Sequence, residues 1–201
     1  RLDQNNFMKA EALTTHLAKD SNVRKVYLIN QNYSTGQQFS SASKEYLKRK
    51  RPDIQIVGDD LHPLGQVKDF APYIAKIRAS GADTVATSNF GADLALLIKA
   101  ARESGLNVNF YTVFGATQGV PAAMGASGAD RVKVVTYWHP NTENQTGRKI
   151  VEELRGKHDE DLVFMPAHSL VTLLRAGFKV AGSSDPVKVA FAMEGMKFQA
   201  L

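Results

Sequence analysis

The chain has 201 residues, of which 43% are hydrophobic and 22% are charged, a composition typical of a globular protein. Cysteine is absent, which excludes disulfides, thiolate metal sites and cysteine nucleophiles. The formal net charge is +5, yet the densest basic run, residues 48–51, ends a predicted helix, where the helix dipole favours cations. We therefore predict no nucleic-acid partner.

Helix and strand patterns alternate along the first 138 residues. Phe7, Met8, Leu13 and Leu17 recur at helical spacing and predict a first helix over 4–18. The further predicted elements are strands at 25–30, 53–57, 83–88, 108–113 and 131–138, and helices at 34–50, 69–80 and 92–104. Strands separated by single helices indicate an α/β fold with a doubly wound parallel sheet, which is Rossmann-like.

Local signals set several of these boundaries. Ser34 and Gln37 have the spacing of a capping box at the start of the second helix. Gly81 and Gly105 predict the ends of the next two helices, because glycine readily adopts the left-handed conformation that ends a helix. One helical turn is expected after Pro121, within the loop over 114–128.

The pattern changes after Trp138. Residues 139–144 read as a polar linker, and helix patterns follow at 145–157, 164–181 and 186–194 without strands between them. We expect residues 1–140 to form one lobe and residues 141–201 to be helices that cover another lobe. The chain begins without methionine and ends at 197–201 in what reads as the start of a strand, so we expect a fragment.

Three strand-to-helix loops, at 30–36, 88–93 and 114–119, should meet at the carboxyl edge of the sheet, where parallel α/β sheets bind ligands. Each loop offers one aromatic ring and a hydroxyl or amide group. The predicted ligand-binding residues are Tyr33, Ser34, Asn89, Phe90, Phe114 and Thr117. A few polar groups among apolar ones are typical of a small-molecule site. The alternative is that the three rings only fill the edge of the core.

Signals of catalysis are weak in this sequence. No glycine-rich dinucleotide or phosphate loop and no G-x-S-x-G nucleophile motif occurs. The five histidines lack metal-ligand spacing and are predicted to lie at the surface or to support other residues. We therefore predict binding without chemistry: no catalytic residue, no metal and no cofactor.

Five segments carry a resemblance to a known family. They are VYLIN at 26–30, YSTG at 33–36, KDFAPYI at 68–74, GADTV at 81–85 and GADLALLIK at 91–99. They resemble the second lobe of the type I periplasmic solute-binding proteins of ABC transporters, in the branched-chain amino acid (Leu/Ile/Val) group. The resemblance implies a periplasmic or extracellular, membrane-associated protein that closes two lobes about a solute and delivers it to a membrane permease. It also matches Tyr33 and Phe90 to aromatic residues of the cleft.

One departure from the family bears on the solute. The resemblance places an acidic residue near Ala116 and Thr117 in amino-acid binders, whereas the loop at 114–118 has no carboxylate. Two kinds of solute are therefore expected. One is a branched-chain amino acid, as the resemblance implies, and the other is a related aliphatic or aromatic carboxylic acid, which suits a cleft without that acidic residue. A ligand-sensing domain of a receptor or transcriptional regulator is the main alternative, and an α/β enzyme is a weaker one.

Overall fold

The computed structural model describes residues 4–139, 143–158 and 165–198. The chain divides into two compact units, residues 4–136 and the residues from Tyr137 onward. The assignment of residues 1–140 and 141–201 to two different lobes stays a prediction. The start of the helix predicted at 164 and the last residues of the strand predicted at 197–201 lie outside the described residues.

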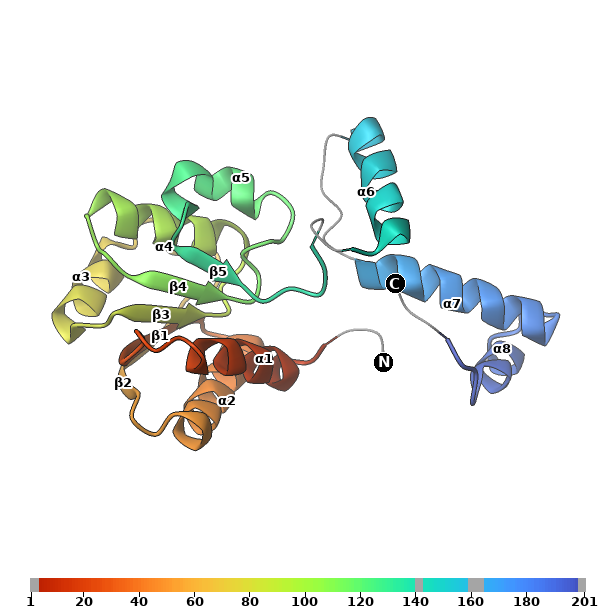
Figure 1. The fold of residues 1–201 in the computed structure, drawn as a ribbon, viewed down its shortest axis with the longest axis horizontal. Coiled ribbons are helices and arrows are strands. Elements are labelled where there is room, and N and C mark those ends of the chain that lie inside the picture. Colours follow the sequence, from red (N-terminus) through yellow and green to blue (C-terminus); the bar gives the residue numbers. More distant parts are fainter. Residues whose placement is uncertain (1–3, 140–142, 159–164, 199–201) are drawn as a thin grey trace. The chain divides into compact units, whose positions relative to one another are not determined.

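The first unit is built on a five-stranded sheet whose strands follow the order β2-β1-β3-β4-β5 (Figure 1). The strands are β1 (Lys25–Gln31), β2 (Gln55–His62), β3 (Thr84–Thr87), β4 (Asn109–Thr112) and β5 (Val132–Val134). Every neighbouring pair is parallel. The predicted parallel α/β fold is therefore confirmed.

Helices cover both faces of this sheet, because alternate residues of each strand point to opposite sides. The helices are α1 (Asn6–Ala18), α2 (Ser34–Lys50), α3 (Ala71–Ser80), α4 (Gly91–Glu103) and α5 (Val120–Met124), with a 3-10 turn at Gly125–Gly128. Val26 and Leu28 of β1 pack in one core with α1 and α2. Tyr27 and Ile29 pack in the opposite core with α3, α4 and α5. The sheet is therefore doubly wound, as predicted.

The two edge strands differ most from their predicted bounds. β2 continues five residues past the predicted end, because its pairing with β1 extends to the pair Gln31 and His62. The polar residues of this stretch are satisfied at the sheet edge: Asp59 accepts a hydrogen bond from Ser40 at 2.7 Å and Asp60 accepts one from Tyr27 at 2.6 Å. Charged groups are common on edge strands. β5 is much shorter than predicted and pairs only along three residues.

The helix signals were partly right. Gly81 and Gly105 adopt φ values of 67° and 68° at the ends of α3 and α4, as predicted. The capping box at Ser34 was wrong: Tyr33 is the N-cap and makes no side-chain capping hydrogen bond, and the Gln37 amide donates to Asn32 instead. The helix instead begins after Tyr33, whose backbone is extended. The Tyr33 side chain therefore lies between the end of β1 and the start of α2.

The apolar face predicted for the first helix needs correction. Phe7 and Met8 are 49% and 53% exposed, whereas the buried residues of α1 include Lys9, Leu13 and Leu17. These three lie at i, i+4 and i+8 and so share one stripe of the helix. A lysine therefore occupies a position that the helical period assigns to the core.

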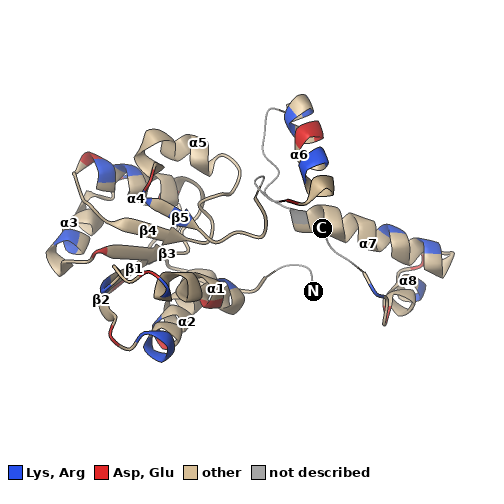
Figure 2. Cartoon of the chain, viewed as in Figure 1, with Lys and Arg blue, Asp and Glu red and all other residues tan. Residues whose placement is uncertain are grey.

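The basic run at the end of α2 is largely ion-paired within the first unit. Arg49 and Lys50 pair with Glu11 at 2.9 and 2.8 Å, and Arg51 pairs with Asp53 at 2.6 Å. Figure 2 shows blue at this end of α2. The cluster ties α2 to α1 and to the turn before β2, which gives it a structural role.

Asp20 links the end of α1 to β4 and β5. Its Oδ2 accepts hydrogen bonds from Tyr111 Oη at 2.7 Å and from Lys133 Nζ at 2.8 Å. The Lys133 ammonium, followed by the Tyr111 hydroxyl, holds the pKa of the Asp20 carboxyl well below its usual range. Because the folded-state pKa is the lower one, the stabilisation is present above about pH 4 and is lost as the pH falls below it.

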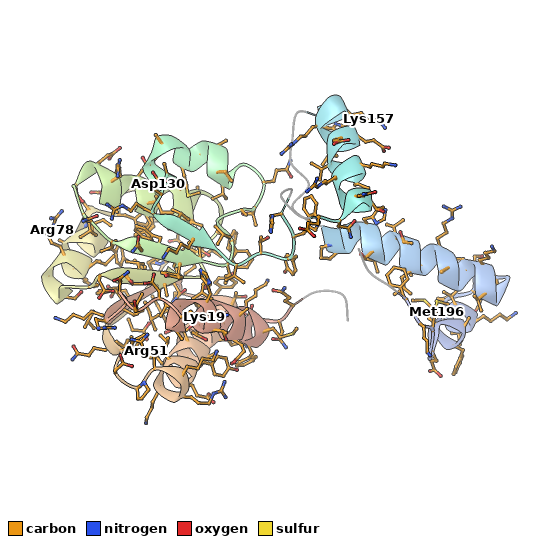
Figure 3. The ribbon with its side chains drawn as sticks, in the orientation of Figure 1. Lys19, Arg51, Arg78, Asp130, Lys157 and Met196 are labelled. Atoms are coloured by element: carbon orange, nitrogen blue, oxygen red, sulfur yellow. The ribbon has the colours of Figure 1, made fainter. Side chains whose placement is uncertain are left out.

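Replacing Asp20 with asparagine should therefore lower the free energy of unfolding by about 1.5 kcal/mol at pH 7. The difference in free energy of unfolding between the wild type and this variant should decrease as the pH falls from 5 to 3. Urea titrations at both pH values measure it. Asp130→Asn is the control, since Asp130 is exposed and asparagine tolerates its left-handed φ of 60° (Figure 3). An equal loss of free energy of unfolding at every pH would contradict this account.

The described part of the second unit contains only helices. They are α6 (Gln145–His158), α7 (Met165–Ala181) and α8 (Pro186–Met193). Asp185 caps α8 by accepting hydrogen bonds from the amides of Val187 and Lys188. Exposed apolar side chains remain on α7 and α8, namely Leu170, Val171, Phe178, Val180, Val187 and Phe191. None of the described helices has the length and apolar character needed to cross a bilayer.

Candidate functional site

The loops that follow β1, β3 and β4 lie together, because these three strands are neighbours and run parallel. A cavity of about 420 Å³ opens among them and beside α1, all within the first unit. Its lining residues are Asn6, Lys9, Tyr33, Thr35, Phe90, Gly91, Phe114, Thr117, Gln118 and Val120. The volume falls within the range of small-molecule sites.

Three aromatic rings, one from each loop, form a continuous series in this cavity. The centroids of Tyr33 and Phe90 are 6.3 Å apart, and those of Phe90 and Phe114 are 5.9 Å apart. Both pairs meet edge to face, an arrangement that aromatic rings favour. Phe90 is the central ring and remains 39% exposed. The series offers an apolar surface for a flat or branched hydrocarbon group.

Four of the six predicted site residues line this cavity, namely Tyr33, Phe90, Phe114 and Thr117. Ser34 is exposed and is not among the lining residues. Asn89 is fully buried and also does not line the cavity. The Thr117 hydroxyl donates to the Phe114 carbonyl at 2.7 Å, so its oxygen keeps the capacity to accept a hydrogen bond.

Asn89 supports the loop that carries Phe90. Its side-chain nitrogen lies 2.8 Å from Nε2 of His62, whose Nδ1 lies 3.1 Å from the Pro63 carbonyl oxygen. Because a carbonyl can only accept, Nδ1 carries the proton and Nε2 accepts from the Asn89 amide. His62 is itself buried, and its ring centroid lies 5.1 Å from that of Phe70. Of the two roles predicted for the histidines, at the surface or in support of other residues, His62 therefore has the second.

A second set of buried hydrogen bonds fixes the same loop to β1. Gln31 donates to Asp93 at 2.8 Å, and Asp93 also accepts from the Gly65 amide at 2.8 Å. The Asn30 side chain accepts from both the amide and the hydroxyl of Ser88. Since Ser88 and Asp93 flank Phe90, these bonds hold the central ring from both sides.

Lys9 is the main residue of the cavity that the sequence analysis missed. Its side chain is 9% exposed, and Nζ lies 4.6 Å from the centroid of the Phe114 ring. This is a cation–π contact. The available signal was its spacing from Leu13 and Leu17, which places a lysine on the buried stripe of α1.

Uncharged side chains predominate in the lining of the cavity. Among the described residues that line the cavity, Lys9 and Tyr33 carry the only ionisable side chains, and none is a carboxylate. The described residues contain no group of three or more side chains that could hold a metal ion. The arrangement can hold a small apolar or anionic solute, and it presents no nucleophile beside a base.

An α/β unit with an aromatic-lined cavity at the carboxyl ends of parallel strands is an arrangement that ligand-binding proteins of this fold class share. The chain belongs to the periplasmic binding protein family, whose model matches residues 1–201.

Curated relatives support this membership. The chain is 34% identical over 131 residues to the Leu/Ile/Val-binding protein homolog 4 of Brucella abortus (strain 2308), covering 65% of this chain and 31% of that protein. It is 25% identical over 134 residues to the leucine-, isoleucine-, valine-, threonine- and alanine-binding protein of Pseudomonas aeruginosa, covering 66% and 36% of the two chains. The matched region thus spans about a third of these relatives.

Solved structures share the fold. The leucine-, isoleucine-, valine-, threonine- and alanine-binding protein from Brucella ovis, in a closed conformation, is 27% identical with a TM-score of 0.82, over 96% of this chain and 50% of that one. A solute-binding protein of an R. palustris ABC transporter in complex with benzoate is 22% identical with a TM-score of 0.85, over 97% and 54%. The chain therefore spans about half the length of these structures.

Proposed function

We propose that this chain forms part of the solute-binding component of an ABC importer, located in the periplasm or outside the cell at the membrane. It binds a small organic solute without chemistry and presents it to a permease. The observation that carries the proposal is the cavity of about 420 Å³ lined by one ring from each of three strand-end loops. The family membership and the names of the relatives support the same role.

Each unit of the chain has a place in this proposal. Residues 4–136 are the second lobe of a two-lobed receptor and carry one wall of its cleft. The helices from α6 to α8 cover the first lobe, which accounts for the apolar side chains exposed on α7 and α8. Closure of the two lobes about a hinge buries the solute.

The proposed contacts follow from the lining. Tyr33, Phe90 and Phe114 pack against the apolar body of the solute, and Thr117 accepts a hydrogen bond from it. Ser34, which is exposed at the start of α2, stays a proposed contact, and Asn89 holds the Phe90 loop in place. The proposed solutes are branched-chain amino acids or related aliphatic and aromatic carboxylic acids, because relatives are named for the former and one fold neighbour holds benzoate.

Calorimetric titration of the full-length protein tests this function. Leucine, 4-methylpentanoate and benzoate represent the three solute classes, and at least one should bind saturably with one solute per protein. The solute recovered after incubation should be chemically unchanged by NMR. Conversion of the solute would support an enzyme, and the absence of binding by all three would contradict a receptor for these solutes.

A further inference from the structure

A second cavity, of about 290 Å³, lies in the first unit at the opposite end of the sheet from the aromatic cavity. The end of α4, the loop that leads into β4 and the residues just before β5 line it, and all of these lie at the amino ends of the strands (Figure 1). The aromatic cavity lies at the carboxyl ends, and the two cavities share no lining residue. The second cavity therefore needs an account of its own.

The floor of this second cavity is an opening in the apolar core. Ile98, Val108 and Phe110 line it and are 1%, 3% and 2% exposed, and the half-buried Leu106 lies beside them. An alkyl chain that enters the cavity would cover these side chains and would itself leave water, which is favourable. The floor therefore suits the hydrocarbon part of a ligand.

Two guanidinium groups are the only charged groups among the residues that line this cavity, and no lining residue is a carboxylate. Arg102 is exposed in the last turn of α4, and Arg131 is half-buried just before β5. The Arg131 carbonyl accepts a hydrogen bond from the Phe110 amide at 2.8 Å, which fixes its backbone beside the floor. In the described part of the chain, neither guanidinium group has a hydrogen-bond or ion-pair partner.

The position of Arg102 alone has a simpler explanation, because a cation in the last turn of a helix is favoured by the helix dipole. That explanation does not extend to Arg131, which lies outside any helix. The Ser104 carbonyl at the end of α4 also has a donor already, since Arg78 donates to it at 2.6 Å. Two like charges around one cavity favour an anion between them, and the planar guanidinium group matches the two oxygens of a carboxylate.

We propose that this cavity is a second binding site, which takes small organic acids with an alkyl chain. The carboxylate pairs with Arg102 and Arg131, and the alkyl chain covers Ile98, Val108 and Phe110. Because the two cavities are separate, the inference does not depend on whether the aromatic cavity binds a solute.

Methyl NMR of the full-length protein with octanoate tests this site and locates it. The methyl signals of Ile98, Leu106 and Val108 should shift saturably, whereas Val120 lines the aromatic cavity and reports separately on binding there. Octanamide, which has the same chain without the charge, should bind about 20-fold more weakly. Butanoate, which lacks four methylene groups, should bind at least about tenfold more weakly.

Variants then assign the preference for the acid to the two arginines. Arg131→Gln should weaken octanoate about tenfold, the effect of one hydrogen bond between charged groups, and Arg102→Gln about threefold, because Arg102 is more exposed. Lys99→Gln is the matched control. Lys99 is exposed on the same helix and does not line the cavity, so the same change in net charge should leave the affinity within about twofold.

Each outcome decides between the two sites. Equal affinity for octanoate and octanamide, or equal losses in Arg131→Gln and Lys99→Gln, would overturn the inference. Octanoate that shifts Val120 but not Ile98, Leu106 and Val108 would also overturn it, while it would support binding in the aromatic cavity. Charge-dependent shifts of Ile98, Leu106 and Val108 would support the second site even if no solute bound to the aromatic cavity.

Discussion

Replacing Phe90 with alanine should weaken solute binding about 30-fold and change stability little. Phe90 is the central ring of the series and keeps 39% of its surface exposed, so an incoming solute can cover it. Burying such a ring against a solute contributes about 2 kcal/mol, which corresponds to the expected loss. Calorimetry on the full-length protein, with the tightest-binding solute found for the wild type, measures the effect.

A matched control lies on the helix that Phe90 precedes. Leu96 of α4 is 37% exposed and does not line the cavity. Leu96→Ala therefore removes a side chain of comparable exposure and should leave affinity within about twofold. Similar losses in both variants would indicate a general disturbance of α4, and full affinity in Phe90→Ala would remove the ring from the site.

Replacing Gly36 with alanine should destabilise the first unit by about 3 kcal/mol. Gly36 is buried near the start of α2, and a Cβ there would overlap the carbonyl oxygen of Gln31 at the end of β1. Backbone atoms cannot rotate away as a side chain would, so either the helix or the strand end must shift. Urea unfolding at neutral pH gives the change in free energy.

The same substitution should also reduce solute affinity, because Tyr33 lies between β1 and α2 and moves with them. Ser34→Ala, two residues earlier, is the control for stability. Ser34 is exposed and does not cap the helix, so this substitution should lower the free energy of unfolding by less than about 0.5 kcal/mol. A Gly36→Ala variant as stable as Ser34→Ala would show that the strand and helix ends adjust more freely than their packing implies.

The sequence predicts the fold well where the signal is local and periodic. Buried strands such as β1 and helices ended by glycine, such as α3 and α4, lie within one or two residues of their predicted ends. The edge strands were less predictable. Residues Gly58, Asp59 and Asp60 do not read as a strand, and they form one because β1 offers a neighbour and because Ser40 and Tyr27 satisfy the two carboxylates.

The position of the cavity could be predicted from sequence more readily than its lining residues. Three polar, aromatic loops after neighbouring parallel strands indicate the edge of the sheet at which the cavity lies. No local pattern shows which of the predicted residues line the cavity and which are buried behind it. Asn89 contacts the buried His62, while Phe90 next to it lines the cavity. Lys9 was missed because it comes from a helix that precedes the first strand.

A crystal structure of the full-length protein with its tightest-binding solute would test the central claim most directly. We expect the solute to lie in the aromatic cavity of the first unit, with its hydrocarbon part against Phe90 and Phe114. A solute bound only elsewhere in the protein, or one held in this cavity without contact to either ring, would contradict the account.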